Sequence, residues 1–154
     1  MQTYRVCFGD TDAGGIVYHA RYFEMAERSR NETLRDAGVP IGDLFLGKLV
    51  EAAGDGIALV LHRGTAKFDT PAFVDDLLTL RSGTLKVNAA RSWWRTVIGR
   101  GPRTVCTVDV ELVCIDRLTK TPVLMPAFIA AAVNRVIDGG NGGITITSNP
   151  GRIR

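Results

Sequence analysis

Hydrophobic residues change their spacing along the chain, and the changes divide it into elements. From about Tyr18 to Ala37 they recur every three or four positions, as they do on one face of a helix. Gly38 and Pro40 follow and favour the end of the helix at this point. Upstream, residues 4–8 alternate and predict a short strand, with Val6 and Phe8 on the same face.

After the helix, the hydrophobic spacing is that of strands. The pattern predicts a further helical turn at 41–46, a final helix at 126–137, and strands at 57–68, 77–87, 92–99 and 105–116. In the last strand three apolar residues alternate with Asp109 and Glu111, which is typical of a sheet with one buried face. The order of elements indicates an α+β fold, with a meander-like antiparallel sheet packed on one helix.

The elements predict one domain and a tail. A chain of 154 residues can bury a sizeable core, and no internal repeat divides it. Residues 1–138 hold all predicted elements and form the expected domain. Residues 139–154 are rich in glycine and are expected to form a C-terminal tail.

Composition narrows the classes of function. The chain is 45% apolar and 23% charged, as in ordinary globular proteins. No apolar run approaches the roughly 18 residues that span a bilayer, and the N-terminus lacks the layout of a signal peptide. We therefore expect a cytoplasmic protein without membrane insertion. The net charge of +3 comes from scattered arginines, so no nucleic-acid partner is expected.

Cysteine and histidine usage argues against a metal site. Cys7, Cys106 and Cys114 lack C-x-x-C spacing and are expected to be small buried hydrophobes. The chain has only two histidines, His19 and His62, and these form no metal-binding motif.

Candidate chemistry is concentrated between the first strand and the long helix. Asp12 could act as a general base or nucleophile, or it could cap the helix or a turn. Asp10 is expected to be structural. The pair Gly14–Gly15 precedes the predicted start of a helix, whose backbone N–H groups can stabilise a developing oxyanion. His19 is expected to line the same site.

The adjacent residues Trp93 and Trp94 lie in a predicted strand, so their rings should point to opposite faces. One ring is expected in the core. The other could lie at an interface or line a ligand pocket.

Residues 8–22, FGDTDAGGIVYHARY, resemble the signature of the 4-hydroxybenzoyl-CoA thioesterase family of hotdog-fold proteins. They are especially similar to its Tol–Pal-associated acyl-CoA thioesterase subfamily. Residues 68–72, 75–78 and 110–116 resemble the strand pattern of the family. The resemblance implies a hotdog fold, in which an antiparallel sheet wraps around the long helix. It also implies a homodimer or homotetramer with active sites at the dimer interface.

The resemblance further implies roles for individual residues. Asp12 matches the catalytic aspartate, and His19 matches the position whose backbone N–H polarises the substrate carbonyl. The substrate-binding candidates are Gly15, Tyr18, Tyr22, Arg91 and Ser92, and Lys120 is a further candidate for a phosphate of CoA.

The implied activity is hydrolysis of an acyl-CoA thioester to the free acid and CoA. No separate cofactor is implied, because CoA enters as part of the substrate. The acyl group could be short-chain or aromatic. The alternative is a non-catalytic hotdog protein that binds acyl thioesters or acts as a scaffold. A related hotdog hydratase is not expected, because its site usually depends on a D-x-x-x-x-H pair and nothing in this sequence is placed to match it.

Overall fold

The computed structural model describes residues 1–45 and 56–138, so the predicted tail lies outside the described residues. Its elements confirm the predicted order, with one additional 3-10 turn, η1. They are β1 (Gln2–Arg5), η1 (Phe8–Asp10), α1 (Arg21–Asp36), α2 (Ile41–Phe45), β2 (Ile57–Phe68), β3 (Leu77–Val87), β4 (Arg91–Arg100), β5 (Arg103–Asp116) and α3 (Ala127–Asp138).

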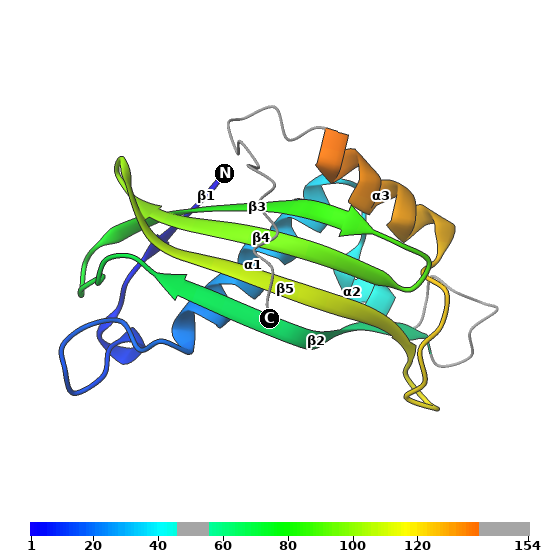
Figure 1. Cartoon of the computed structure of the whole chain (residues 1–154), viewed down its shortest axis with the longest axis horizontal. Coiled ribbons are helices and arrows are strands. Elements are labelled where there is room, and N and C mark those ends of the chain that lie inside the picture. Colours follow the sequence, from blue (N-terminus) through cyan, green and yellow to red (C-terminus); the bar gives the residue numbers. More distant parts are fainter. Residues whose placement is uncertain (46–55, 139–154) are drawn as a thin grey trace, which may run out of the picture.

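The five strands form one antiparallel sheet in the order β1-β3-β4-β5-β2. The central strands β3, β4 and β5 form a meander, while the long strand β2 and the short strand β1 form the two edges. Helix α1 runs along one face of this sheet, and α3 lies near one of its ends (Figure 1). This arrangement confirms the predicted hotdog architecture.

Small residues let α1 lie close to the sheet. Ala26 and Ser29 face the core and are 1% exposed. The Ser29 hydroxyl lies 2.9 Å from that of Ser82, which in turn lies 2.7 Å from the hydroxyl of Thr96. These hydrogen bonds satisfy polar groups that would be costly to bury alone, and they fix α1 against β3 and β4.

The two tryptophans lie on opposite faces of β4, as predicted. Trp94 is 1% exposed and belongs to the core, where its indole N–H donates to Ser92 Oγ at 3.0 Å. Trp93 is half-buried on the outer face, with the Lys86 ammonium 5.1 Å from its ring centre.

The first predicted strand is too long. The strand ends at Arg5, and the backbone then turns because the Cys7 N–H donates to Asp10 Oδ2 at 2.8 Å. Val6 remains buried, whereas Phe8 is 84% exposed, so the two side chains do not share a face. Cys7 is also exposed, contrary to expectation.

The predicted start of the long helix is three residues too early. The Tyr18 N–H donates to the carbonyl of Asp10 at 2.9 Å, which keeps residues 18–20 in the preceding loop. No described helix is both long enough and apolar enough to cross a membrane.

Candidate active site

A tight turn presents Asp12 at the surface. The Asp12 N–H donates to Ile16 O at 3.0 Å, and the Gly15 N–H donates to Asp12 O at 3.0 Å. Gly15 has a φ of +74°, a conformation that favours glycine. A Cβ on Gly14 would lie only 3.0 Å from Asp12 Oδ1, which accepts the Gly14 N–H at 2.7 Å. The glycine pair therefore allows both the turn and the position of the carboxylate.

The base of this turn is fixed to the rest of the fold. Thr11 and Val17 form an antiparallel bridge, and the Val17 N–H donates to Ala72 O at 2.9 Å. Val17 is 3% exposed, so the exposed turn stands on a buried support.

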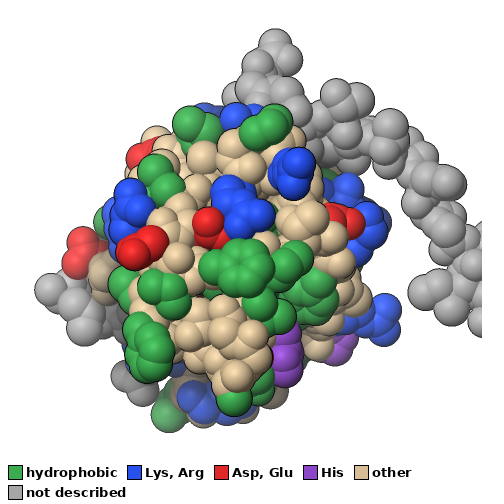
Figure 2. All heavy atoms as spheres, turned by 90° about the vertical axis from the view of Figure 1, so that its left-hand side faces the viewer, with side chains coloured by type: hydrophobic (Ala, Val, Ile, Leu, Met, Phe, Trp, Pro, Cys, Tyr) green, Lys and Arg blue, Asp and Glu red, His purple; other side chains and the backbone are tan. Residues whose placement is uncertain are grey.

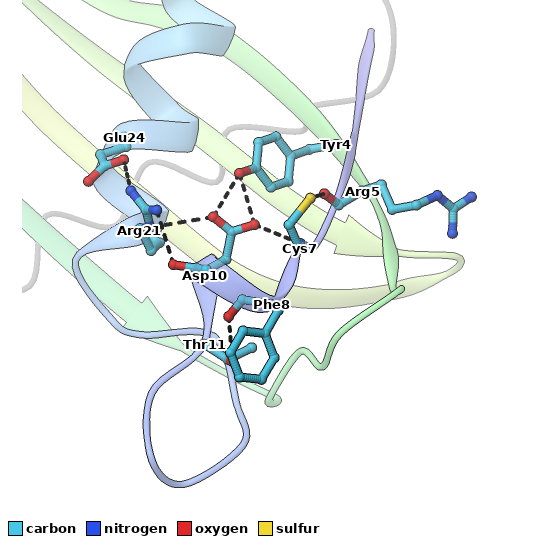
Figure 3. A network of polar contacts seen from close by, with 9 residues as sticks. Tyr4, Arg5, Cys7, Phe8, Asp10, Thr11, Arg21 and Glu24 are labelled. Carbon is cyan, nitrogen blue, oxygen red and sulfur yellow. Dashed lines mark hydrogen bonds and ion pairs between the residues drawn. The ribbon is translucent and has the colours of Figure 1, made fainter.

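Asp10, unlike Asp12, is buried. Figure 3 shows its carboxylate surrounded by polar partners. It is 4% exposed, and its carboxylate accepts hydrogen bonds from the Tyr4 hydroxyl and the Cys7 N–H. Arg21 Nε lies 3.4 Å from its Oδ1 atom. These partners agree with the structural role expected of Asp10.

A pocket of about 440 Å³ opens between the turn, the start of α1 and the end of β2. Its walls combine carboxylates with apolar and aromatic side chains. The lining residues are Asp12, Ile16, Val17, His19, Tyr22, Phe68, Asp69, Thr70 and Pro71. Hydrophobic side chains also gather on the surface at one end of the molecule (Figure 2).

Two aromatic residues shape the apolar wall of the pocket. The rings of Tyr22 and Phe68 are 5.5 Å apart and tilted by 59°. Burial raises the pKa of the Tyr22 phenol, and Tyr22 is only 4% exposed. Tyr22 is therefore a neutral, fixed part of the wall at physiological pH.

The two carboxylates of the pocket have different partners. Asp69 Oδ1 forms an ion pair with Lys67 Nζ at 2.6 Å. Among the described residues, Asp12 has no cationic partner, and its carboxylate accepts only the Gly14 N–H. The Asp12 carboxylate is thus the one whose charge is not already neutralised.

The N-terminus of α1 lies beside the same pocket. Its N-cap residue, Ala20, provides no side-chain cap. The backbone N–H of His19 has no acceptor among the described residues, while the His19 ring packs on Tyr18 at 4.3 Å. A free N–H at the positive end of a helix can bind an oxygen that carries negative charge.

The structure brings together only part of the predicted site. Asp12, His19 and Tyr22 line the pocket; Gly15 and Tyr18 belong to the same loop but do not line it. Residues 68–71 also line the pocket, and the sequence analysis did not predict this. The sequence did contain one indication, because Asp69 places a carboxylate directly after the predicted strand 57–68.

Arg91 and Ser92 lie far from this pocket. Arg91 pairs with Val113 on β5, whereas Phe68 pairs with Cys106. These positions on β5 are seven residues apart, or about 23 Å along a strand. Arg91 forms an ion pair with Glu111.

Ser92 is fully buried and accepts the Trp94 indole N–H, so its hydroxyl serves the core of the chain. Lys120 lies in the turn after β5 and has a positive φ of 60°. No group of three His, Cys, Asp or Glu side chains suited to a metal occurs in the described part of the chain.

Comparison with known proteins agrees with this geometry. The model of the thioesterase-like superfamily matches residues 6–133. The acyl-CoA thioester hydrolase YbgC of Escherichia coli (strain CFT073) is 30% identical over 128 residues, covering 82% of this chain and 90% of the relative. YbgC of Haemophilus influenzae, an acyl-CoA thioesterase, is 30% identical over 132 residues, covering 86% and 92% of the two chains.

A solved structure gives the same result. A probable thioesterase from Bartonella henselae superposes with a TM-score of 0.74 at 34% identity, covering 81% of this chain and 97% of the other. The chain therefore belongs to the thioesterase-like superfamily of hotdog proteins.

Proposed function

We propose that this protein hydrolyses acyl-CoA thioesters in the pocket beside the N-terminus of α1. The observation that carries the proposal is the shared position of Asp12 and His19 in the wall of one pocket. One supplies a carboxylate without a cationic partner, and the other a free backbone N–H. The 30% identity to YbgC, named an acyl-CoA thioester hydrolase, supports the same substrate class.

The proposed reaction uses these two groups on opposite parts of the thioester. The Asp12 carboxylate attacks the carbonyl carbon, or it takes a proton from a water molecule that attacks. Negative charge then develops on the carbonyl oxygen, where the His19 N–H and the helix dipole stabilise it. One such oriented donor contributes about 2.7–4 kcal/mol to lowering the barrier. The CoA thiolate leaves as the carbonyl reforms. If Asp12 itself attacks, this step leaves the acyl group on Asp12 as a mixed anhydride, which water then hydrolyses to release the free acid and regenerate the Asp12 carboxylate.

The acyl group would occupy the apolar part of the pocket. The tilted pair Tyr22 and Phe68 gives an aromatic acyl group edge and face contacts. A volume of about 440 Å³ also accommodates a short aliphatic chain. Trp94 is enclosed in the core and cannot contact the acyl group. The preference for an aromatic or a short aliphatic acyl group would therefore depend on Tyr22 and Phe68, the two aromatic residues of the pocket.

We also propose that two copies of the chain pair along strand β2. This strand is an edge of the sheet over 12 residues, and an unpaired edge exposes backbone hydrogen-bonding groups. Leu61 and Phe68 on this strand are 57% and 51% exposed. Pairing would bury both side chains and enclose the pocket, which includes Phe68.

The function is tested by measuring thiol release from a panel of aliphatic and aromatic acyl-CoAs. Wild-type protein and Asp12→Asn are compared, with circular dichroism as the control for folding. Hydrolysis of one acyl class by the wild type alone is the expected result. If the wild type releases no thiol from any member, the enzymatic proposal fails and a binding or scaffold role takes its place.

A further inference from the structure

We propose that Tyr4 and Arg21 are positioning residues that act on the active site through Asp10. The three residues form the Asp10 junction, which joins β1, the loop before α1 and the first turn of α1 (Figure 3). The inference rests on the proposed function, because it assigns the junction the task of holding Asp12 and the His19 N–H at a fixed separation.

The side chains of the junction converge on one buried carboxylate. The Tyr4 hydroxyl lies 2.9 Å from Asp10 Oδ1 and 3.0 Å from Oδ2, so it spans both oxygens and limits rotation of the carboxylate. Arg21 Nε approaches Oδ1 at 3.4 Å, and Arg21 Nη2 donates to Gly9 O at 3.1 Å. Burial, and next the hydrogen bond to Asp10, raises the pKa of Tyr4, which keeps its hydroxyl protonated as a donor.

The backbone of Asp10 connects this carboxylate to both proposed catalytic groups. Asp12 follows it by two residues. The Asp10 carbonyl accepts the N–H of Tyr18, which directly precedes His19. Arg21 is the first residue of α1. A shift of Asp10 therefore moves Asp12 through the chain that follows it, and moves the His19 N–H through the hydrogen bond to Tyr18. The distance and orientation between the two groups change as a result.

This geometry matters more to the reaction than to the stability of the fold. Misplacement of reacting groups by about 1 Å can lower a rate on the order of 100-fold. The hydroxyl of Tyr4 is one neutral donor at the end of an edge strand, and the Cys7 N–H and Arg21 still satisfy Asp10 without it. Its removal leaves the core unchanged and loosens only the orientation of Asp10.

The test is the Tyr4→Phe variant, which removes only this hydroxyl. On the best acyl-CoA, we expect kcat to fall about tenfold while KM changes less than twofold. Leu80→Ala is the control: Leu80 is buried on β3, where it pairs with Gln2 of the edge strand β1, and it lies outside the junction, so this variant loses stability and keeps kcat. An unchanged kcat in Tyr4→Phe, or an equal fall in both variants, overturns the proposal.

A double-mutant cycle tests whether Tyr4 acts through Asp10. The second change is Asp10→Asn. The double variant should have the same kcat as Asp10→Asn alone, because the effects of two substitutions do not add when one residue acts through the other. A further tenfold fall in the double variant means that Tyr4 acts by another route.

Amide hydrogen exchange separates this inference from the proposed function. In Tyr4→Phe, exchange should become faster in residues 10–19 and stay unchanged in β4 and β5. This readout needs no turnover, so it decides the inference even if the wild type hydrolyses no acyl-CoA and the proposed function fails. Unchanged exchange in residues 10–19 contradicts the positioning role.

Discussion

Asp12 and Asp69 differ in charge environment although both line one pocket. Lys67 compensates Asp69, whereas Asp12 accepts a backbone N–H in an exposed turn. The Asp69 carboxylate is held in an ion pair with Lys67, whereas the Asp12 carboxylate has no cation beside it and is open to a substrate or a water molecule. At the scale of single residues, this difference supports our proposal that Asp12 is the reacting group.

Ser92 allows a separate test at the same scale. We predict that Ser92→Ala lowers the free energy of unfolding by about 1–3 kcal/mol, because the buried Trp94 indole N–H loses its acceptor. The KM for acyl-CoA should stay unchanged, since Ser92 is fully buried and outside the pocket. Chemical denaturation and steady-state kinetics measure the two effects. A raised KM without loss of stability would instead identify Ser92 as a ligand of CoA.

Local patterns predicted the strands well. The bounds of β2 and β3 match the predicted ranges. In β3 the alternate residues Leu78 and Leu80 are buried, as strand spacing predicts, whereas β2 buries only its first residue, Ile57. The chain before α1 was predicted less well, since the side chain of Asp10 competes with regular backbone pairing there.

The site was predictable only where its residues are near in sequence. Asp12, His19 and Tyr22 lie within eleven positions of one another, so one motif contains them. Phe68 and Asp69 reach the same pocket through the pairing of β2 with β5, which is a property of the assembled sheet. No local pattern specifies that register.

The edge strand β2 provides a prediction at the scale of elements. Leu61→Lys places a charge on the exposed edge, so we expect it to convert the proposed dimer into a monomer. Light scattering should give twice the 16.7 kDa chain mass for the wild type and a single chain mass for the variant. Leu118→Lys is the control, because Leu118 is 71% exposed in the turn after β5. A wild-type monomer, or an unchanged mass in Leu61→Lys, contradicts pairing through this edge.

The fold of the whole molecule determines which thiols react. Burial raises the pKa of Cys106 to about 12 and that of Cys114 to about 11, so neither forms the reactive thiolate at pH 8. Cys7 is exposed. We predict that a thiol reagent labels one cysteine per native chain and all three after denaturation, as counted by mass spectrometry.

The raised pKa values of Cys106 and Cys114 also predict how the stability of the fold changes at alkaline pH. Above pH 9, the unfolded chain releases thiol protons that the folded chain retains, so these two groups lower stability as the pH rises. More than one label on the native chain at pH 8 would show that Cys106 or Cys114 is accessible.

The most direct measurement of the central claim compares kcat for wild type, Asp12→Asn and Asp69→Asn on the best acyl-CoA. The two variants remove one charge each from the same pocket, and thermal unfolding checks that both remain folded. We predict that Asp12→Asn lowers kcat by at least about 100-fold, the lower end of the contribution of a general base, while Asp69→Asn keeps most of the rate. Retention of full activity by Asp12→Asn, or a larger loss in Asp69→Asn, would contradict the assignment of Asp12 as the catalytic carboxylate.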